Sequence, residues 1–133
     1  MKSRVLSFVA LGIGLVVIPI PMFAHHGRSA YDFKKTITLT GTITAFDWAN
    51  PHCLIYIDVK TDSGEVQHWT LEMSPPSTMS RRGWTENTLK RGDQVAAQTH
   101  PAKNGITLGI SSNPDFIMKF VVNGRELPAN AND

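Results

Sequence analysis

The sequence predicts an all-β fold with little helix: a five-stranded antiparallel barrel, one short helix between its third and fourth strands, and a C-terminal hairpin. Five short segments alternate apolar and polar side chains with the period of two that is typical of β-strands. A helix-start signal lies between the third and fourth of these segments. The length of 133 residues suits one domain and is too short for a large multi-domain enzyme.

The first three strands are predicted from this alternation. From Thr36 to Ala45, threonines alternate with an inward set that comprises Ile37, Leu39, Gly41, Ile43 and Ala45. After an Asn-Pro turn, the segment from His52 to Lys60 has its inward set at Cys53, Ile55, Ile57 and Val59. The composition of Thr61 to Gly64 is that of a hairpin turn, so the third strand, Val66 to Met73, pairs antiparallel with the second and turns inward Trp69, Leu71 and Met73.

The helix is predicted between Ser74 and Arg82. Proline is tolerated in a first turn, the segment offers Ser and Thr as N-caps, and Gly83 is a suitable end. A second short helical turn is expected from Glu86 to Leu89. Trp84 follows the helix and is expected to close the bottom of the barrel.

The fourth and fifth strands are predicted at 94–99 and 106–110, and a last strand runs from 116 to 122. Asn123-Gly124 then predicts a tight hairpin into Arg125 to Leu127. One helix between strands three and four of a five-stranded set is the layout of the OB-fold barrel, whereas an immunoglobulin-like sandwich has about seven strands. We therefore expect an OB-like barrel over 36–127 and a disordered tail over 128–133.

Residues 1–24 have the pattern of a cleaved signal peptide. Lys2 and Arg4 precede an apolar run from Val5 to Phe23, and Ala24 supplies a small residue before the expected cut. An uncleaved anchor is the alternative, since about 20 apolar residues span a bilayer, but two prolines near the end of the run argue against a continuous helix. We expect a location in the periplasm or outside the cell, with membrane contact only before cleavage.

The mature domain is electrically neutral. Removing residues 1–24 takes two of the 13 Lys and Arg residues and leaves 11 against 11 Asp and Glu. Nucleic-acid binding depends on a basic surface, so no nucleic-acid partner is expected. The sequence has no Gly-Xaa-Ser-Xaa-Gly elbow, no glycine-rich phosphate loop and no His-Glu-Xaa-Xaa-His motif, so an ordinary hydrolase or nucleotide enzyme is not predicted.

Residues 25–35 form a His-containing segment ahead of the barrel. Cleavage after Ala24 would give His25 both an α-amine and an imidazole, a chelating pair that suits Cu(II). A third ligand from His26, His52 or His68 would complete an arrangement that resembles the copper site known as a histidine brace. The alternative is a solvated polar stub. The hypothetical metal ligands are His25, His26 and His52, with copper as the metal they favour.

Strand parity suggests a second site. His52, Tyr56, His68 and Glu72 share the face opposite the inward set. His52 and Glu72 are farthest from the turn and are expected to approach each other, whereas His68 is expected to lie too far along its strand. Such a pair suits metal binding or orientation of the ring, and a solvated polar face is the alternative. With the adjacent turn, which presents an exposed tryptophan, the predicted binding surface is Trp48, Asn50, His52, Tyr56 and Glu72.

Several short motifs occur in order along the mature chain: His25-His26-Gly27, Tyr31-Asp32, Trp48-Ala49-Asn50-Pro51-His52, Arg82-Gly83-Trp84 and Leu89-Lys90-Arg91-Gly92-Asp93. Together they resemble a family of short exported bacterial proteins known only as a domain of unknown function. The resemblance covers nearly the whole mature chain. It implies an exported small domain, and it implies no activity, cofactor or catalytic residue.

The sequence as a whole predicts a non-enzymatic, exported OB-like binding or accessory domain with an unidentified small ligand. A copper-binding protein that uses His25 with His52 is the alternative. A further alternative is an assembly partner of an envelope protein, to which the barrel would offer its strand edges.

Overall fold

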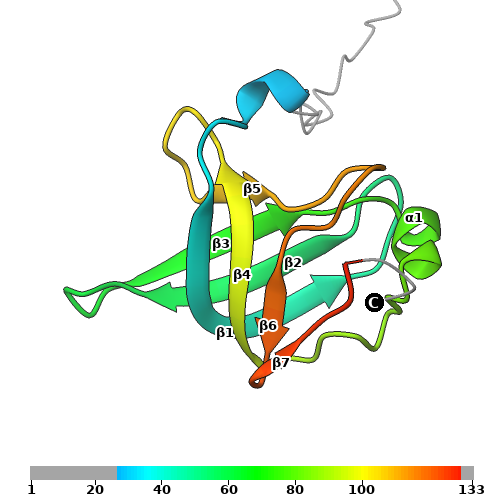
Figure 1. Cartoon of the computed structure of the whole chain (residues 1–133). Coiled ribbons are helices and arrows are strands. Elements are labelled where there is room, and N and C mark those ends of the chain that lie inside the picture. The colour runs from blue at the N-terminus through cyan, green and yellow to red at the C-terminus, as the bar shows by residue number, and fades with distance from the viewer. Residues whose placement is uncertain (1–26, 130–133) are drawn as a thin grey trace, which may run out of the picture.

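The computed structural model describes residues 27–129, which form one barrel with short additions at both ends (Figure 1). The predicted signal peptide and both N-terminal histidines, His25 and His26, lie outside the described residues. Between Gly27 and Ala129 no helix has the length and apolar character needed to cross a membrane. The elements are η1 (Arg28–Ala30), β1 (Ile37–Asp47), β2 (Leu54–Lys60), β3 (Val66–Glu72), α1 (Pro76–Arg81), β4 (Gln94–Pro101), β5 (Leu108–Ile110), β6 (Phe120–Val122) and β7 (Arg125–Glu126).

Five strands close the barrel in the order β1-β2-β3-β5-β4, and β4 returns to β1. The predicted OB-like barrel, with one short helix between its third and fourth strands and strands added at the C-terminus, is confirmed. One pairing differs from the all-antiparallel expectation, because β3 and β5 run parallel. The reason is geometric: around a closed ring of five strands, direction cannot alternate at every step. One parallel pair is therefore unavoidable.

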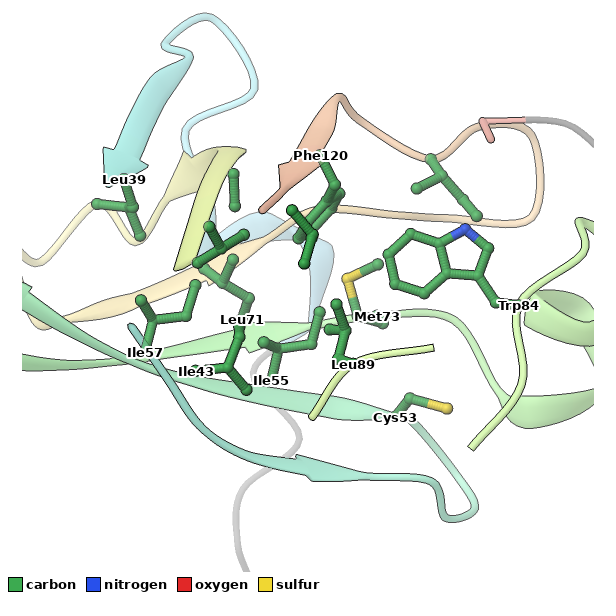
Figure 2. Packing of buried hydrophobic residues seen from close by; sticks show 14 of the residues in the cluster. Leu39, Ile43, Cys53, Ile55, Ile57, Leu71, Met73, Trp84, Leu89 and Phe120 are labelled. Atoms are coloured by element: carbon green, nitrogen blue, oxygen red, sulfur yellow. The ribbon is translucent and has the colours of Figure 1, made fainter. Parts of the chain in front are cut away.

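The barrel interior is filled by the inward faces of its strands (Figure 2). The parity predicted for the second strand is confirmed, since Cys53, Ile55 and Ile57 are fully buried and Val59 packs partly buried against the core. In β3, Leu71 is buried and Trp69 is partly buried, and Met73, which directly follows the strand, is also buried. Each fully buried aliphatic side chain contributes roughly 1.5–3 kcal/mol relative to exposure, so this packing is a main source of stability.

A β-bulge changes the parity of the first strand. Leu39 and Ile43 are buried as predicted, and Ile43 lies opposite Ile57. One extra residue in β1 then shifts the register, so that Ala45 lies opposite the outward residue Tyr56 and Phe46 packs against the core. The inward position predicted for Ala45 is therefore wrong, because a bulge moves every later side chain to the other face.

The helix is shorter than predicted and starts differently. α1 has Pro75 as its N-cap with no side-chain cap hydrogen bond, so the predicted Ser or Thr cap is wrong. Ser74 is buried instead, and its backbone N–H donates to Ser112 Oγ at 2.6 Å. Gly83 ends the helix as predicted, with a φ of 84° that favours glycine. The expected helical turn at 86–89 is a hydrogen-bonded turn rather than a helix.

The C-terminal hairpin extends the sheet from β4, because β6 pairs antiparallel with β4 and β7 pairs with β6. Only 120–122 of the predicted last strand form β6, whereas Ile117 bridges to Ser112. Asn123 and Gly124 have positive φ, as the predicted tight turn requires. Trp84 is buried as expected, packs edge-to-face on Phe120 at 5.3 Å, and donates from Nε1 to the carbonyl of Pro128. The tail is thus held as far as Ala129, whose carbonyl accepts from Arg82, and 130–133 lie outside the described residues.

The pairing of β5 with β4 requires that position 109 has no side chain. A Cβ added there would collide with Thr99 Oγ1 on the neighbouring strand. We expect Gly109→Ala to lower the free energy of unfolding by about 1–3 kcal/mol, measured by urea denaturation. In a Thr99→Ala background the cost is expected to fall, because the colliding oxygen is removed. Gly27→Ala, which has ample space, is the matched control; equal losses in both variants would contradict the argument.

Candidate functional site

The segment before β1 pairs with the chain at the end of β4. Tyr31 forms an antiparallel bridge with Ala102, and the flanking backbone bonds run from Asp32 N to Pro101 O and from Lys103 N to Ala30 O, each at 2.9 Å. Tyr31 is only 1% exposed. The segment is therefore part of the fold, and it places Tyr31 beside the end of β3.

Glu72, the last residue of β3, is the centre of a three-residue cluster. Tyr31 Oη donates to Glu72 Oε2 at 2.6 Å, and His52 Nδ1 lies 2.8 Å from Glu72 Oε1. A carboxylate oxygen accepts this bond, so Nδ1 carries a hydrogen. The pairing of Leu54 with Glu72 ends the β2–β3 ladder and leaves His52 just beyond it. The predicted approach of His52 to Glu72 is confirmed.

A cavity of about 370 Å³ opens next to this cluster. It lies where the parallel strands β3 and β5 both end, because Glu72 is in register with Ile110. Most of its walls are apolar, with polar groups at a few positions. Its lining comprises Gly27, Arg28, Tyr31, His52, Glu72, Ser74, Pro75, Ile110, Ser112, Asn113 and Pro114.

The loop after β5 forms one wall, and hydrogen bonds hold it in place. Asn113 is 7% exposed, and its Oδ1 accepts from the backbone N–H of Asp115 at 2.7 Å and of Phe116 at 3.1 Å. Ser112 Oγ accepts from Ser74 N and donates to Ser74 Oγ. These bonds join the loop to the chain that enters α1, so the wall is pre-formed.

Burial and neighbouring carboxylates keep the phenols near the barrel neutral. Burial raises the pKa of Tyr31, and the hydrogen bond and negative charge of Glu72 raise it further. Burial also raises the pKa of Tyr56, and the hydrogen bond and negative charge of Asp47 raise it further. Burial also raises the pKa of the Cys53 thiol, against a smaller lowering from its hydrogen bond with the backbone of Ala49. Cys53 is therefore a core residue with little thiolate character, as its parity predicted.

The predicted binding surface is divided in the structure. His52 and Glu72 meet at the cavity, but Trp48, Asn50 and Tyr56 do not line it. Trp48 is partly buried, edge-on to Phe46 at 5.7 Å. Asn50 is exposed before Pro51, and Tyr56 donates to Asp47 at 3.1 Å.

The described histidines His68 and His100 do not line this cavity. His68 pairs with Asp58 at 2.6 Å on the exposed β2–β3 hairpin, in keeping with its expected distance from His52. The ligands His25 and His26 of the copper hypothesis lie outside the described residues. Within 27–129 no three His, Cys, Asp or Glu side chains are grouped as a metal site.

Three important residues were not predicted as site residues: Tyr31, Arg28 and Asn113. Tyr31 and Arg28 precede the barrel, in a stretch without strand or helix periodicity. Asn113 belongs to a Ser-Ser-Asn-Pro run that reads as an ordinary loop. The one available signal was a tyrosine in the mostly polar segment that precedes the barrel. Its partner, Glu72, is 41 positions away, so the sequence could not show which residue it bonds to.

Comparison with known families agrees with the motifs in the sequence. The model of the family of unknown function DUF6152 matches residues 13–112, three quarters of the chain. The chain belongs to the DUF6152 family. The resemblance to a domain of unknown function is thus confirmed, and the matched region includes Tyr31, His52 and Glu72. Neither a curated protein nor a solved structure matches this DUF6152 chain.

The Tyr31–Glu72 bond predicts a pH-dependent stability. An unfolded tyrosine ionises near pH 10, whereas folded Tyr31 keeps its proton to higher pH. Above about pH 10 the unfolded state therefore binds fewer protons, and the free energy of unfolding falls as pH rises. We expect Tyr31→Phe to cost about 1–3 kcal/mol at neutral pH and to make this alkaline decline shallower.

Urea denaturation between about pH 8 and pH 11 measures both effects. Tyr56→Phe is the matched control, since that phenol is more exposed and bonds to Asp47 at the surface. An alkaline decline in Tyr31→Phe as steep as in the wild type would contradict the prediction.

Proposed function

We propose that this DUF6152 protein is an exported binding or accessory domain whose ligand site is the cavity beside Glu72. The observation that carries the proposal is the His52–Glu72–Tyr31 cluster at the wall of a 370 Å³ cavity. Small-molecule sites have volumes of roughly 300–1,000 Å³ and mostly apolar walls with a few fixed polar groups. The cavity has both properties, and its volume favours a small ligand.

Export is supported by the sequence alone. The basic start and the apolar run before Ala24 have the signal-peptide pattern, and the folded domain begins only a few residues later, with Arg28. Cleavage after Ala24 would retain every described residue that lines the cavity, the first of which is Gly27. We therefore propose a mature periplasmic or secreted form that begins at His25.

Native mass spectrometry of the protein recovered from the periplasm tests the ligand site. We expect a species that carries one small molecule, which Pro114→Trp should abolish because the indole fills the cavity from its rim. The neighbouring exposed residue Asp115 does not line the cavity, so Asp115→Trp is the matched control and should retain the molecule. An adduct that persists in Pro114→Trp, or its absence from the wild type, would count against the proposal.

A copper site that uses His25 with His52 is the second candidate. Glu72 engages Nδ1 of His52, and histidines that bind metals through one ring nitrogen commonly donate the other N–H to a carboxylate. Gly27, which follows His25-His26 directly, lines the same cavity as His52. A mature chain that begins at His25 would have its N-terminus two residues before this lining glycine, so its amine and imidazole could join the ring of His52 as nitrogen donors.

Intact mass with and without added Cu(II) tests this candidate. We expect a chain that begins at His25 to retain one copper, and His25→Ala and His52→Ala to lose it. His68→Ala is the matched control, because His68 also pairs with a carboxylate through Nδ1 but lies outside the cavity. Copper retained by His52→Ala would refute the site. An envelope protein that co-purifies whatever the residue at position 25 would favour the assembly role instead.

A further inference from the structure

We propose that the cavity takes a small carboxylate ligand with an apolar body, whose carboxylate is bound by the Asn113 amide and the Arg28 guanidinium. This inference deepens the proposed function and rests on it. It uses described residues only, and it is independent of the copper candidate.

The first observation is the orientation of the Asn113 amide. Because Oδ1 accepts two backbone N–H bonds, its assignment as oxygen is settled and Nδ2 is the remaining donor. Nδ2 has no hydrogen-bond partner among residues 27–129. In this region two side-chain atoms are fully buried and lack a hydrogen-bond partner, Thr99 Oγ1 and Ser111 Oγ. Nδ2 of Asn113 is not one of them, so it is accessible to a small molecule. Asn113 is 93% buried and lines the cavity, so the cavity is where a ligand could meet this donor.

The second observation is a cation at the same cavity. Arg28 lines it, and its guanidinium carbon lies 5.2 Å from the centre of the Phe33 ring, a cation–π contact that limits the freedom of the side chain. A guanidinium and an amide N–H are both donors, and the planar guanidinium matches a carboxylate in geometry as well as charge. A ligand with acceptor oxygens would satisfy both groups.

The other residues that line the cavity indicate the chemistry of the rest of the ligand. Among the described residues that line the cavity, Glu72 is the one carboxylate, and each of its oxygens already has a partner in Tyr31 or His52. Ile110, Pro75 and Pro114 offer apolar surface. The cavity is therefore complementary to a short carboxylic acid with an aliphatic or aromatic body, and less so to a neutral or cationic molecule.

Titration of the ¹⁵N-labelled mature chain with butyrate, and separately with 1-butanol, tests the proposal. Both probes have the same apolar chain, and only butyrate has the carboxylate. We expect saturable shifts of the Asn113 side-chain amide and the Arg28 Nε–H resonances with butyrate. We expect 1-butanol to bind at least about tenfold more weakly, because it lacks the carboxylate that Asn113 and Arg28 would bind. A tenfold difference in Kd corresponds to about 1.4 kcal/mol.

Asn113→Asp is the decisive variant. It keeps the oxygen that accepts from Asp115 and Phe116 and replaces the donor with a second oxygen, so the loop is retained. We expect butyrate affinity to fall by at least about tenfold with little change in melting temperature. Asn104→Asp is the matched control, since Asn104 Oδ1 also accepts a backbone N–H two residues on, in an exposed turn outside the cavity. Arg28→Gln should weaken butyrate binding as well.

The outcomes separate this inference from the proposed function. Equal binding of butyrate and 1-butanol, or unchanged butyrate binding in Asn113→Asp, would overturn the carboxylate proposal. If a bound small molecule is still lost in Pro114→Trp, the ligand site itself stands. If the protein carries no such molecule and neither probe shifts the cavity resonances, both proposals fail.

Discussion

The carboxylate of Glu72 holds three separate parts of the chain together at one end of the barrel. Its side chain is 19% exposed, and a carboxylate so far removed from water needs hydrogen-bond donors. Tyr31 supplies one from the N-terminal segment, and His52 supplies the other from the connection between β1 and β2. The backbone carbonyl of Glu72 also accepts from Ser111, which starts the loop that walls the cavity. Glu72 therefore bonds to the N-terminal segment, the β1–β2 connection and the loop after β5.

Barrel closure explains why the site lies at this end. An odd ring of strands contains one parallel pair, and here that pair is β3 and β5. Parallel strands finish at the same edge, so Glu72 and Ile110 end side by side and their loops leave in the same direction. The Ser112–Ser74 bonds then join those two loops. The cavity is lined by the ends of both strands and by residues of both loops.

Sequence patterns were sufficient for the barrel because strand faces depend on local alternation. The inward set of β2, the hairpin at Thr61–Gly64 and the approach of His52 to Glu72 follow from a period of two and one turn. Alternation failed at Ala45, because the extra residue of the bulge lies just before it in β1 and leaves no mark in the composition. The N-cap of α1 was missed for a similar reason, because Ser74 bonds to a serine 38 positions away instead of to its own helix.

By itself, then, the sequence determined the antiparallel pairing of β2 with β3, the place of the helix, the family and one half of the candidate site. Tertiary structure decided the other half, because the contacts of Tyr31 and Asn113 with the cavity have no periodic signature. Tyr31 reaches Glu72 across 41 positions, and Asn113 faces the cavity only once β5 has paired with β3. Local alternation predicts which face a side chain takes, and only the closed barrel determines which distant side chains share that face.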